Sequence, residues 1–334
     1  MDLTTDYLGL RLRSPLVASA SPLAQTVPGV QRLAAAGVGA VVLPSLFEEQ
    51  VRREADQDAW LAEAGAESVA ESLSYLPATD GEAGPRRYLS LLERAVAVAG
   101  IPVIASLNGV TPGGWTDYAT ALEEAGAAAI ELNVYYLPGD PLMDGRDIEQ
   151  RYVDILTTVK AAVTIPVAVK LAPYLSSVGQ FALRLDAAGA DGLVLFNRFM
   201  QTGIDPETLT VSSGLSLSSP AEAALPRSWI ARLRGRVRAS LAASTGVADS
   251  ADLAAYLLAG ADVVMTTSAL LRHGPGYAAV LLDGLTAWMR RKRFTAIGDV
   301  RGLLAEQAGT GEEHYGRPGY LDAIREATRA YGAR

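Results

Sequence analysis

Cysteine is absent from the 334-residue sequence. This absence excludes disulfide bonds, thiolate zinc sites, cysteine-ligated iron–sulfur clusters and a cysteine nucleophile or base. Only two histidines are present, His273 and His314. A multi-histidine metal site or a serine-type triad is therefore not expected either.

Long hydrophobic runs and a surplus of positive charge are also lacking. No run approaches the length of a membrane span, and the first residues lack the basic region and apolar core of a signal peptide. The formal net charge of −8 argues against a nucleic-acid surface. These features predict a soluble cytoplasmic protein without membrane or nucleic-acid partners.

Lysine is scarce, because arginine carries almost all of the positive charge. The lysines are Lys160, Lys170 and Lys292. The two residue types are not interchangeable where a compact ammonium is needed. A lysine inside an apolar strand of such a chain, as Lys170 is, therefore becomes a candidate for function.

A helical run, a glycine near its end and an apolar strand recur in this order four times. Glycine just past a helix end adopts the left-handed conformation that caps the helix. Strands that alternate with helices predict a parallel sheet. The copies of the pattern are residues 33–43, 122–132, 185–196 and 257–265.

Eight short strands can be counted in all, each followed by a helical pattern. That number in roughly 250–300 residues is typical of a closed (β/α)8 TIM barrel. A doubly wound open sheet is the rival, and the count and the lack of a Gly-rich fingerprint after the first strand favour the barrel. The expected strands span residues 15–19, 40–43, 101–106, 128–132, 165–170, 192–196, 237–242 and 262–265.

The remaining segments surround this barrel. Residues 3–12 alternate and predict a β-hairpin that plugs its base. The long connection 45–85 is either a functional lid or a solvated excursion. A Ser- and Gly-rich excursion covers 202–220. We expect a barrel domain at 1–290 and a C-terminal helical extension at 291–334, packed on the outside.

Residues just past the carboxyl ends of barrel strands face the active site. Strand 128–132 leads into Asn133, Tyr135 and Tyr136, which are the first candidates for chemistry. Lys170 ends the fifth strand, where an amine can form a Schiff base or stabilise a developing anion. A lysine that extends outward from the core edge is the alternative.

Asn197 ends the sixth strand and offers a donor and an acceptor to an amide-bearing ligand, although a turn-capping role is also open. The last two strands end in hydroxyls and small residues. The loops after strands seven and eight are the usual phosphate site of this fold, while ordinary N-capping is the alternative. The loop residues are Ser244, Thr245 and Gly246, then Thr267 and Ser268.

These motifs together resemble the dihydroorotate dehydrogenase family, whose members are FMN-dependent (β/α)8 barrels. The resemblance covers residues 3–290. It is carried by the order and spacing of several short motifs, since each alone is weak. They are SPLVAS at 14–19, ELNV at 131–134, VAVK at 167–170, Asn197, Gly246 and the Gly274-Pro275 pair.

The resemblance implies roles for individual residues. Ala18, Ser19 and Ala20 would lie against the flavin through their backbone. Lys170 would stabilise the reduced ring, and Asn133, Tyr135 and Asn197 would bind a pyrimidine-like substrate, with Asn197 also contacting the cofactor. Ser244, Thr245, Gly246, Thr267 and Ser268 would hold the FMN phosphate. The family also implies a homodimer, a small-molecule substrate and, for some members, an electron-transfer protein partner.

The chain departs from the family pattern at defined positions. Pro44 stands where relatives have lysine, and SLSYLP at 72–77 replaces an asparagine-containing segment. In the base loop, 133–138, Tyr136 stands at the position of the catalytic cysteine or serine. Glycines of the phosphate loops are replaced by Thr245 and Thr267. We therefore interpret the chain as a divergent, dihydroorotate dehydrogenase-like branch.

The leading hypothesis is reduction or oxidation of a CH–CH bond through FMN, with Tyr136 as proton donor or acceptor. A phenol is a poor base at neutral pH and a better positioned acid. Two alternatives stay open. One is an aldolase-type barrel in which Lys170 forms a Schiff base, and the other is a non-catalytic FMN-binding scaffold.

Overall fold

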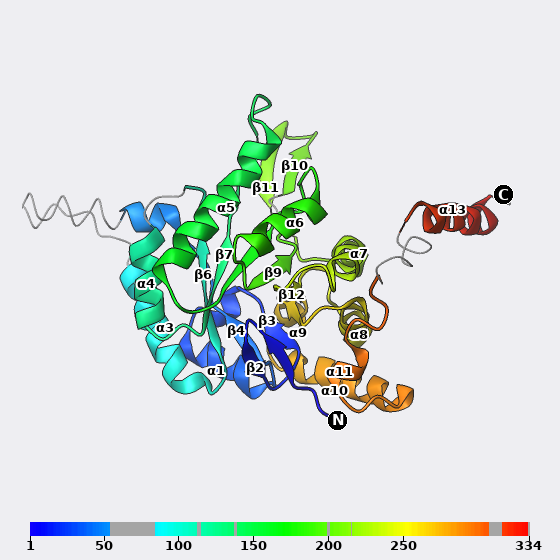
Figure 1. The fold of residues 1–334 in the computed structure, drawn as a ribbon, viewed down its shortest axis with the longest axis horizontal. Helices are drawn as coiled ribbons and strands as arrows, with labels where there is room; N and C mark the ends of the chain where they lie inside the picture. The colour runs from blue at the N-terminus through cyan, green and yellow to red at the C-terminus, as the bar shows by residue number, and fades with distance from the viewer. Residues whose placement is uncertain are drawn as a thin grey trace, which may run out of the picture.

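A closed ring of eight parallel strands forms the centre of the protein (Figure 1). The computed structural model describes residues 1–53, 84–111, 115–136, 139–198, 201–214, 216–306 and 316–332. Pairing of β4 with both β3 and β6 closes the ring. Its strands are β3 (Leu16–Ala18), β4 (Ala40–Val42), β6 (Val103–Asn108), β7 (Ala129–Asn133), β8 (Val167–Leu171), β9 (Gly192–Leu195), β12 (Ser240–Ala243) and β13 (Val263–Thr266).

The ring confirms the predicted (β/α)8 barrel and excludes the open doubly wound sheet. Each expected strand overlaps an observed one. A further short strand, β5 (Leu46–Phe47), pairs with the end of β6 and was not predicted. It extends the sheet beyond the ring at the carboxyl edge, because the chain leaving β4 continues alongside β6 before it turns.

Helices surround the ring. The glycines that end the helical half of each repeat have φ values of +99°, +89°, +95° and +117°, which confirms their predicted left-handed conformation. The helices are α1 (Val27–Ala35), α3 (Pro85–Ala99), α4 (Trp115–Glu124), α5 (Gly145–Ala162), α6 (Val178–Ala187), α7 (Ala224–Leu233), α8 (Ser250–Ala259) and α10 (Tyr277–Lys292). Shorter ones are η1 (Pro22–Ala24), η3 (Pro220–Ala223), α9 (Ser268–His273) and α11 (Ile297–Val300).

Two apolar layers stabilise this arrangement, because successive strand residues face opposite sides. The outer layer lies between strands and helices. The inner layer fills the lower part of the ring and combines strand residues with the N-terminal hairpin. Its buried members are Tyr7, Leu8, Leu12, Val17, Ala40, Val42, Ile104, Ala129, Ala168, Val194, Ala242, Val263 and Met265.

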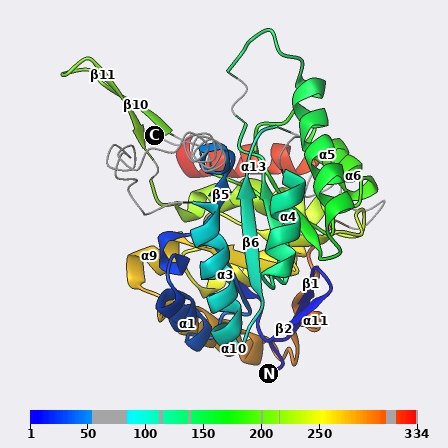
Figure 2. The ribbon, with the colours of Figure 1, turned by 90° about the vertical axis from the view of Figure 1, so that its left-hand side faces the viewer.

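The hairpin β1 (Thr5–Tyr7) and β2 (Leu10–Leu12) confirms the predicted plug. It lies at the amino end of the strands, opposite the end from which β10 and β11 project (Figure 2). The Thr5 hydroxyl donates to the Asp262 carbonyl at 2.9 Å, and the Leu8 N–H donates to the Ser240 hydroxyl at 3.1 Å. The base of the barrel is thus filled and tied to two strands.

The start of the chain also bonds to the segment that follows α10. The Asp2 N–H donates to the Thr295 carbonyl at 2.9 Å, and the Ile297 N–H donates to the Asp2 carbonyl at 3.0 Å. Ile297 and Val300 of α11 are buried. The two ends of the barrel sequence therefore hold each other in place.

Two elements differ from expectation. The excursion after β9 forms a hairpin, β10 (Gln201–Asp205) and β11 (Thr210–Gly214), which projects from the body (Figure 2). In the C-terminal extension, which was expected to pack outside the barrel, α11 has buried residues but helix α13 (Arg317–Tyr331) has none. Most of the predicted lid, including segment 72–77, lies outside the described residues. No helix in the described part is long and apolar enough to cross a membrane.

Gly39→Ala should destabilise the barrel. A Cβ atom there would lie 2.2 Å from the Ser14 carbonyl oxygen, where the chain leaving the plug passes β4. We expect the free energy of unfolding to fall by about 1–3 kcal/mol in urea denaturation. Gly298→Ala is the control, because its Cβ meets nothing within 4 Å. Equal stability of the two variants would contradict the close approach.

Candidate functional site

The interior of the barrel changes from apolar to polar toward the carboxyl ends of the strands. Ala129 and Ala168 belong to the apolar interior. Two residues further along the same strands, and therefore on the same face, stand Glu131 and Lys170. Asn133 follows two residues after Glu131. The mouth of the ring is thus lined by the polar groups expected at the active end of this fold.

Lys170 lies within this mouth and is 7% exposed. Its ammonium contacts the Ser19 hydroxyl and Glu131 Oε1, each at 3.4 Å. Glu131 is 1% exposed, and its Oε2 has no hydrogen-bond partner among the described residues. The prediction that Lys170 points into the barrel is thereby supported over an outward-extending side chain.

Glu131 was missed at the sequence level. The signal that identified Lys170, a charged residue inside an apolar strand, applies to it equally. Buried polar atoms are nearly always hydrogen-bonded, so an orphan carboxylate oxygen beside two long contacts indicates an incomplete set of partners. Below the pair, burial raises the pKa of Tyr7 well above its usual range, and the charges of Glu131 and Asp262 add to this effect.

Two amides meet across the mouth. Asn197 Nδ2 donates to Asn133 Oδ1 at 2.7 Å, so the structure brings together the two residues proposed for substrate recognition. Asn133 is also in register with Lys170 on the neighbouring strand. Asn108 pairs with Asn133 on the other side and is 7% exposed. Asn108 was not predicted, because its strand was expected to end at residue 106.

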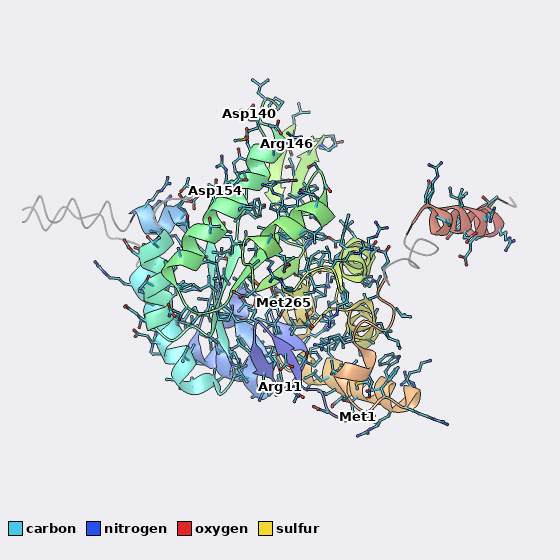
Figure 3. All side chains as sticks on the ribbon, viewed as in Figure 1. Met1, Arg11, Asp140, Arg146, Asp154 and Met265 are labelled. Atoms are coloured by element: carbon cyan, nitrogen blue, oxygen red, sulfur yellow. The ribbon has the colours of Figure 1, made fainter. Side chains whose placement is uncertain are left out.

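Tyr136 lies on the α5 side of the mouth. Its hydroxyl donates to Met143 Sδ at 2.8 Å, and the Arg151 guanidinium stacks over its ring at 4.5 Å from the centroid. Figure 3 places Asp140, from the β7–α5 connection, and Arg146, from the first turn of α5, at the top of the view. Tyr135 is half-buried beside it. Within the described residues, Tyr136 therefore contacts this connection and α5, and not the Lys170–Glu131 pair.

The buried carboxylate of Glu48 fixes the loop after β6, which contacts Arg151 of α5. Glu48 accepts hydrogen bonds from the N–H groups of Val110, at 2.8 Å, and Thr111, at 3.1 Å, and pairs with Arg52. Arg151, which stacks on the Tyr136 ring, donates to the Val110 carbonyl at 3.0 Å. Burial alone would raise the pKa of Glu48, but its hydrogen bonds outweigh burial and lower it.

The two predicted phosphate loops are joined by Ser218, which sequence reasoning missed. Its hydroxyl lies 3.0 Å from the Ser268 hydroxyl and accepts the Gly246 N–H at 3.2 Å. Arg272 donates to the Ser218 carbonyl at 2.9 Å. Gly246 has φ +75°, and a Cβ there would lie 2.6 Å from the Ala223 nitrogen, so only glycine fits.

The threonines that replace family glycines leave the loops intact. Thr245 keeps a glycine-like φ of +82°, which is rare for a β-branched residue. Its hydroxyl donates to the Phe196 carbonyl at 3.1 Å, and its own carbonyl accepts from Tyr256 at 2.6 Å. The Thr267 hydroxyl donates to the Ser19 carbonyl at 3.2 Å. Both hydroxyls are thus used within the protein.

The other expected cofactor contacts occupy the same rim. Ala18 is buried in the outer apolar layer, so its side chain faces the helices and its backbone faces the mouth. Ala20 packs against the inner layer. The Ser19 N–H donates to the Thr266 carbonyl at 3.2 Å, and the Ser244 N–H donates to the Leu195 carbonyl at 2.7 Å.

A cavity of about 450 Å³ lies beside the mouth, between the end of β4 and the starts of α1 and α3. Pro44, at the position of the family lysine, lines it. The Ser45 hydroxyl lies 2.8 Å from the Ser106 hydroxyl, and the Ser106 N–H donates to the Tyr88 hydroxyl at 2.9 Å. These polar contacts on the cavity wall are therefore made within the protein.

Comparison with known proteins gives a consistent result. The profile of the family described as dihydroorotate dehydrogenase matches residues 62–289. A protein of Aeropyrum pernix, named for dihydroorotate dehydrogenase A (fumarate), is 30% identical over 90% of this chain and 97% of its own length. The catalytic subunit of dihydroorotate dehydrogenase B (NAD(+)) from Methanocella arvoryzae is 30% identical over 87% of this chain and 94% of its own.

A third relative extends the range of organisms. The catalytic subunit of dihydroorotate dehydrogenase B (NAD(+)) from Methanothermobacter thermautotrophicus is 27% identical over 90% of this chain and 98% of its own length. These matches span nearly the whole of the relatives. The similarity is therefore one of complete barrels and not of a shared fragment.

Glu48→Gln should lower stability in a pH-dependent way. The depressed pKa of the native carboxylate stabilises the fold above its ordinary value of 4.5, and this contribution is lost as pH falls through the native pKa. We expect a loss of about 1–2 kcal/mol at pH 7 that shrinks below pH 4.5. Urea unfolding across pH measures it. Glu49→Gln, at the exposed neighbour, is the control, and a pH-independent loss for Glu48→Gln would contradict the role.

Proposed function

This chain belongs to the dihydroorotate dehydrogenase family, and from that premise we propose that it is an FMN-dependent oxidoreductase of a pyrimidine-like, dihydroorotate-like CH–CH bond. The observation that carries the proposal is the buried Lys170 ammonium at the strand end, next to the Asn133–Asn197 amide pair. A cation and paired amides at one rim suit a planar heterocycle with an electron-accepting edge.

The residues of the rim fit FMN. An orphan carboxylate oxygen and two long lysine contacts indicate that a partner is missing beside the Lys170 pair. Hydroxyls of Ser218 and Ser268, the left-handed Gly246 and the nearby Arg272 form a donor set suited to a phosphate. When bound, FMN supplies two-electron chemistry, accepting or returning a hydride.

The chain's own residues then have distinct tasks. Lys170 would stabilise negative charge that develops on the bound cofactor. Asn133 and Asn197 orient the substrate, since each amide retains one group outside their mutual hydrogen bond. Tyr136 donates or accepts the substrate proton. Its hydroxyl now donates to a thioether, a weak acceptor, and can exchange this contact for a stronger acceptor on a substrate.

Partner proteins follow from the relatives' names. Two of the relatives are named as catalytic subunits of an NAD(+)-dependent enzyme, and another is named with fumarate. We propose that this chain forms a homodimer and that its electron acceptor is either a small molecule such as fumarate or a second protein. The departures at Pro44 and Tyr136 favour a substrate that differs from dihydroorotate.

Schiff-base chemistry is less well supported. A Schiff base requires attack on a carbonyl by a free amine. The Lys170 amine instead contacts a carboxylate and a hydroxyl, an arrangement that suits stabilisation of charge. Borohydride trapping with carbonyl compounds on colourless protein would favour the aldolase, and a yellow protein inert to every donor and acceptor would favour the scaffold.

The purified protein should be yellow and release FMN on denaturation. Ser218→Ala should weaken FMN affinity about tenfold, because one loop-joining hydroxyl is lost. Binding of riboflavin, which lacks the phosphate, should be unchanged. Ser240→Ala, at the opposite end of the barrel, is the control. Fluorescence titration of apoprotein gives both affinities, and equal weakening for riboflavin would reject the phosphate assignment.

Tyr136→Phe should slow turnover about 10²–10⁴-fold while FMN affinity stays constant, because only proton transfer is removed. Stopped-flow reduction by dihydroorotate, and reoxidation by orotate or fumarate, would measure it. Tyr320→Phe, the same change on the exposed helix α13, should have no effect. An unchanged rate in Tyr136→Phe with any productive pair would remove tyrosine from the mechanism.

A further inference from the structure

We propose that Glu131 is a positioning residue that sets the reduction potential of the bound cofactor by offsetting the charge of Lys170. The inference rests on the proposed binding of FMN. Glu131 lies below the rim, two residues before Asn133 on the same strand and therefore deeper in the barrel. It acts by balancing the charge of the ammonium, and not through direct contact with the substrate.

The geometry around Glu131 supports this assignment. The carboxylate is 1% exposed, and its one hydrogen bond among the described residues is from Lys170, at 3.4 Å. A carboxylate that served the fold alone would collect several short hydrogen bonds, as Glu48 does from two backbone N–H groups. Oε2 has no partner in the described part of the chain. The arrangement therefore places a nearly bare negative charge beside the amine.

The same contacts hold the amine loosely. An ammonium has three donors, and the two contacts of Lys170 within the described residues, to Ser19 and Glu131, are both 3.4 Å long. The long contacts leave the charge available to a ligand, while the carboxylate keeps it inside the barrel. Without Glu131, a cation that is 7% exposed would stand uncompensated.

The charges of the pair sum to zero. Two-electron reduction places negative charge on a bound flavin, so any fixed charge nearby shifts its potential. Removal of the carboxylate leaves a net positive site, which favours the reduced cofactor. Removal of the amine leaves a net negative site, which favours the oxidised cofactor. The two residues should therefore act in opposite directions, which a purely structural role for Glu131 does not predict.

The test is a double-mutant cycle on FMN-loaded protein with Glu131→Gln, Lys170→Met and both together. The potential of the bound flavin is measured by equilibration with reference dyes. We expect Glu131→Gln to shift the reduced-to-oxidised ratio at least tenfold toward reduced, about 30 mV for a two-electron couple. Lys170→Met should shift it the opposite way, and the double variant should lie between. Glu149→Gln, a buried carboxylate paired with Arg184 outside the barrel, should leave it unchanged.

The outcomes separate this inference from the function it rests on. If wild-type protein binds no FMN, the proposed function fails. If FMN binds and loss of the carboxylate leaves the potential unchanged in both backgrounds, the role of Glu131 is overturned while the function stands. Should Glu131→Gln alone fail to fold, Lys170→Met compared with the double variant measures the effect of the carboxylate on the potential in the absence of the ammonium, and an unchanged potential there overturns the role.

Discussion

A buried ion pair inside a closed ring of strands is the interaction on which the site depends. Lys170 and Glu131 can be charged there only because each compensates the other. The lower half of the ring is filled by hydrocarbon and by the N-terminal hairpin, so the polar groups are confined to the upper half. Because apolar side chains fill the base of the barrel, the polar groups of the candidate site are gathered at its mouth.

The barrel was predictable because its signals are local and repeated. Each strand is a short apolar run bounded by turn residues, and each helix end carries its glycine. Placement of Asn133, Lys170 and Asn197 at one rim followed from topology alone, since parallel strands bring their carboxyl ends together. The contact between the two asparagines bears out that reasoning for the amides.

The parts that escaped prediction depend on long-range contacts. Ser218 lies in a serine-rich segment, and only the fold brings it between the loops after β12 and β13. Glu131 needed the strand register to place it beside Lys170. The contacts of Tyr136 depend on Arg151, a turn and a half into the next helix. The β10–β11 hairpin was hard to predict from the sequence. No residue of β10 is buried, so the strand does not need the alternation of apolar and polar residues that identifies a half-buried strand.

The bonds between Asp2 and the segment after α10 have a consequence for biosynthesis. The plug, the first barrel strand and residue 2 all have partners at residues 240–297, in the last third of the chain. At bacterial or eukaryotic ribosome speeds, the apolar N-terminal segment waits roughly 15 to 60 s for these partners to emerge. Ring closure must then come late, and the nascent chain is most exposed to chaperones and to mispairing at its very first strands.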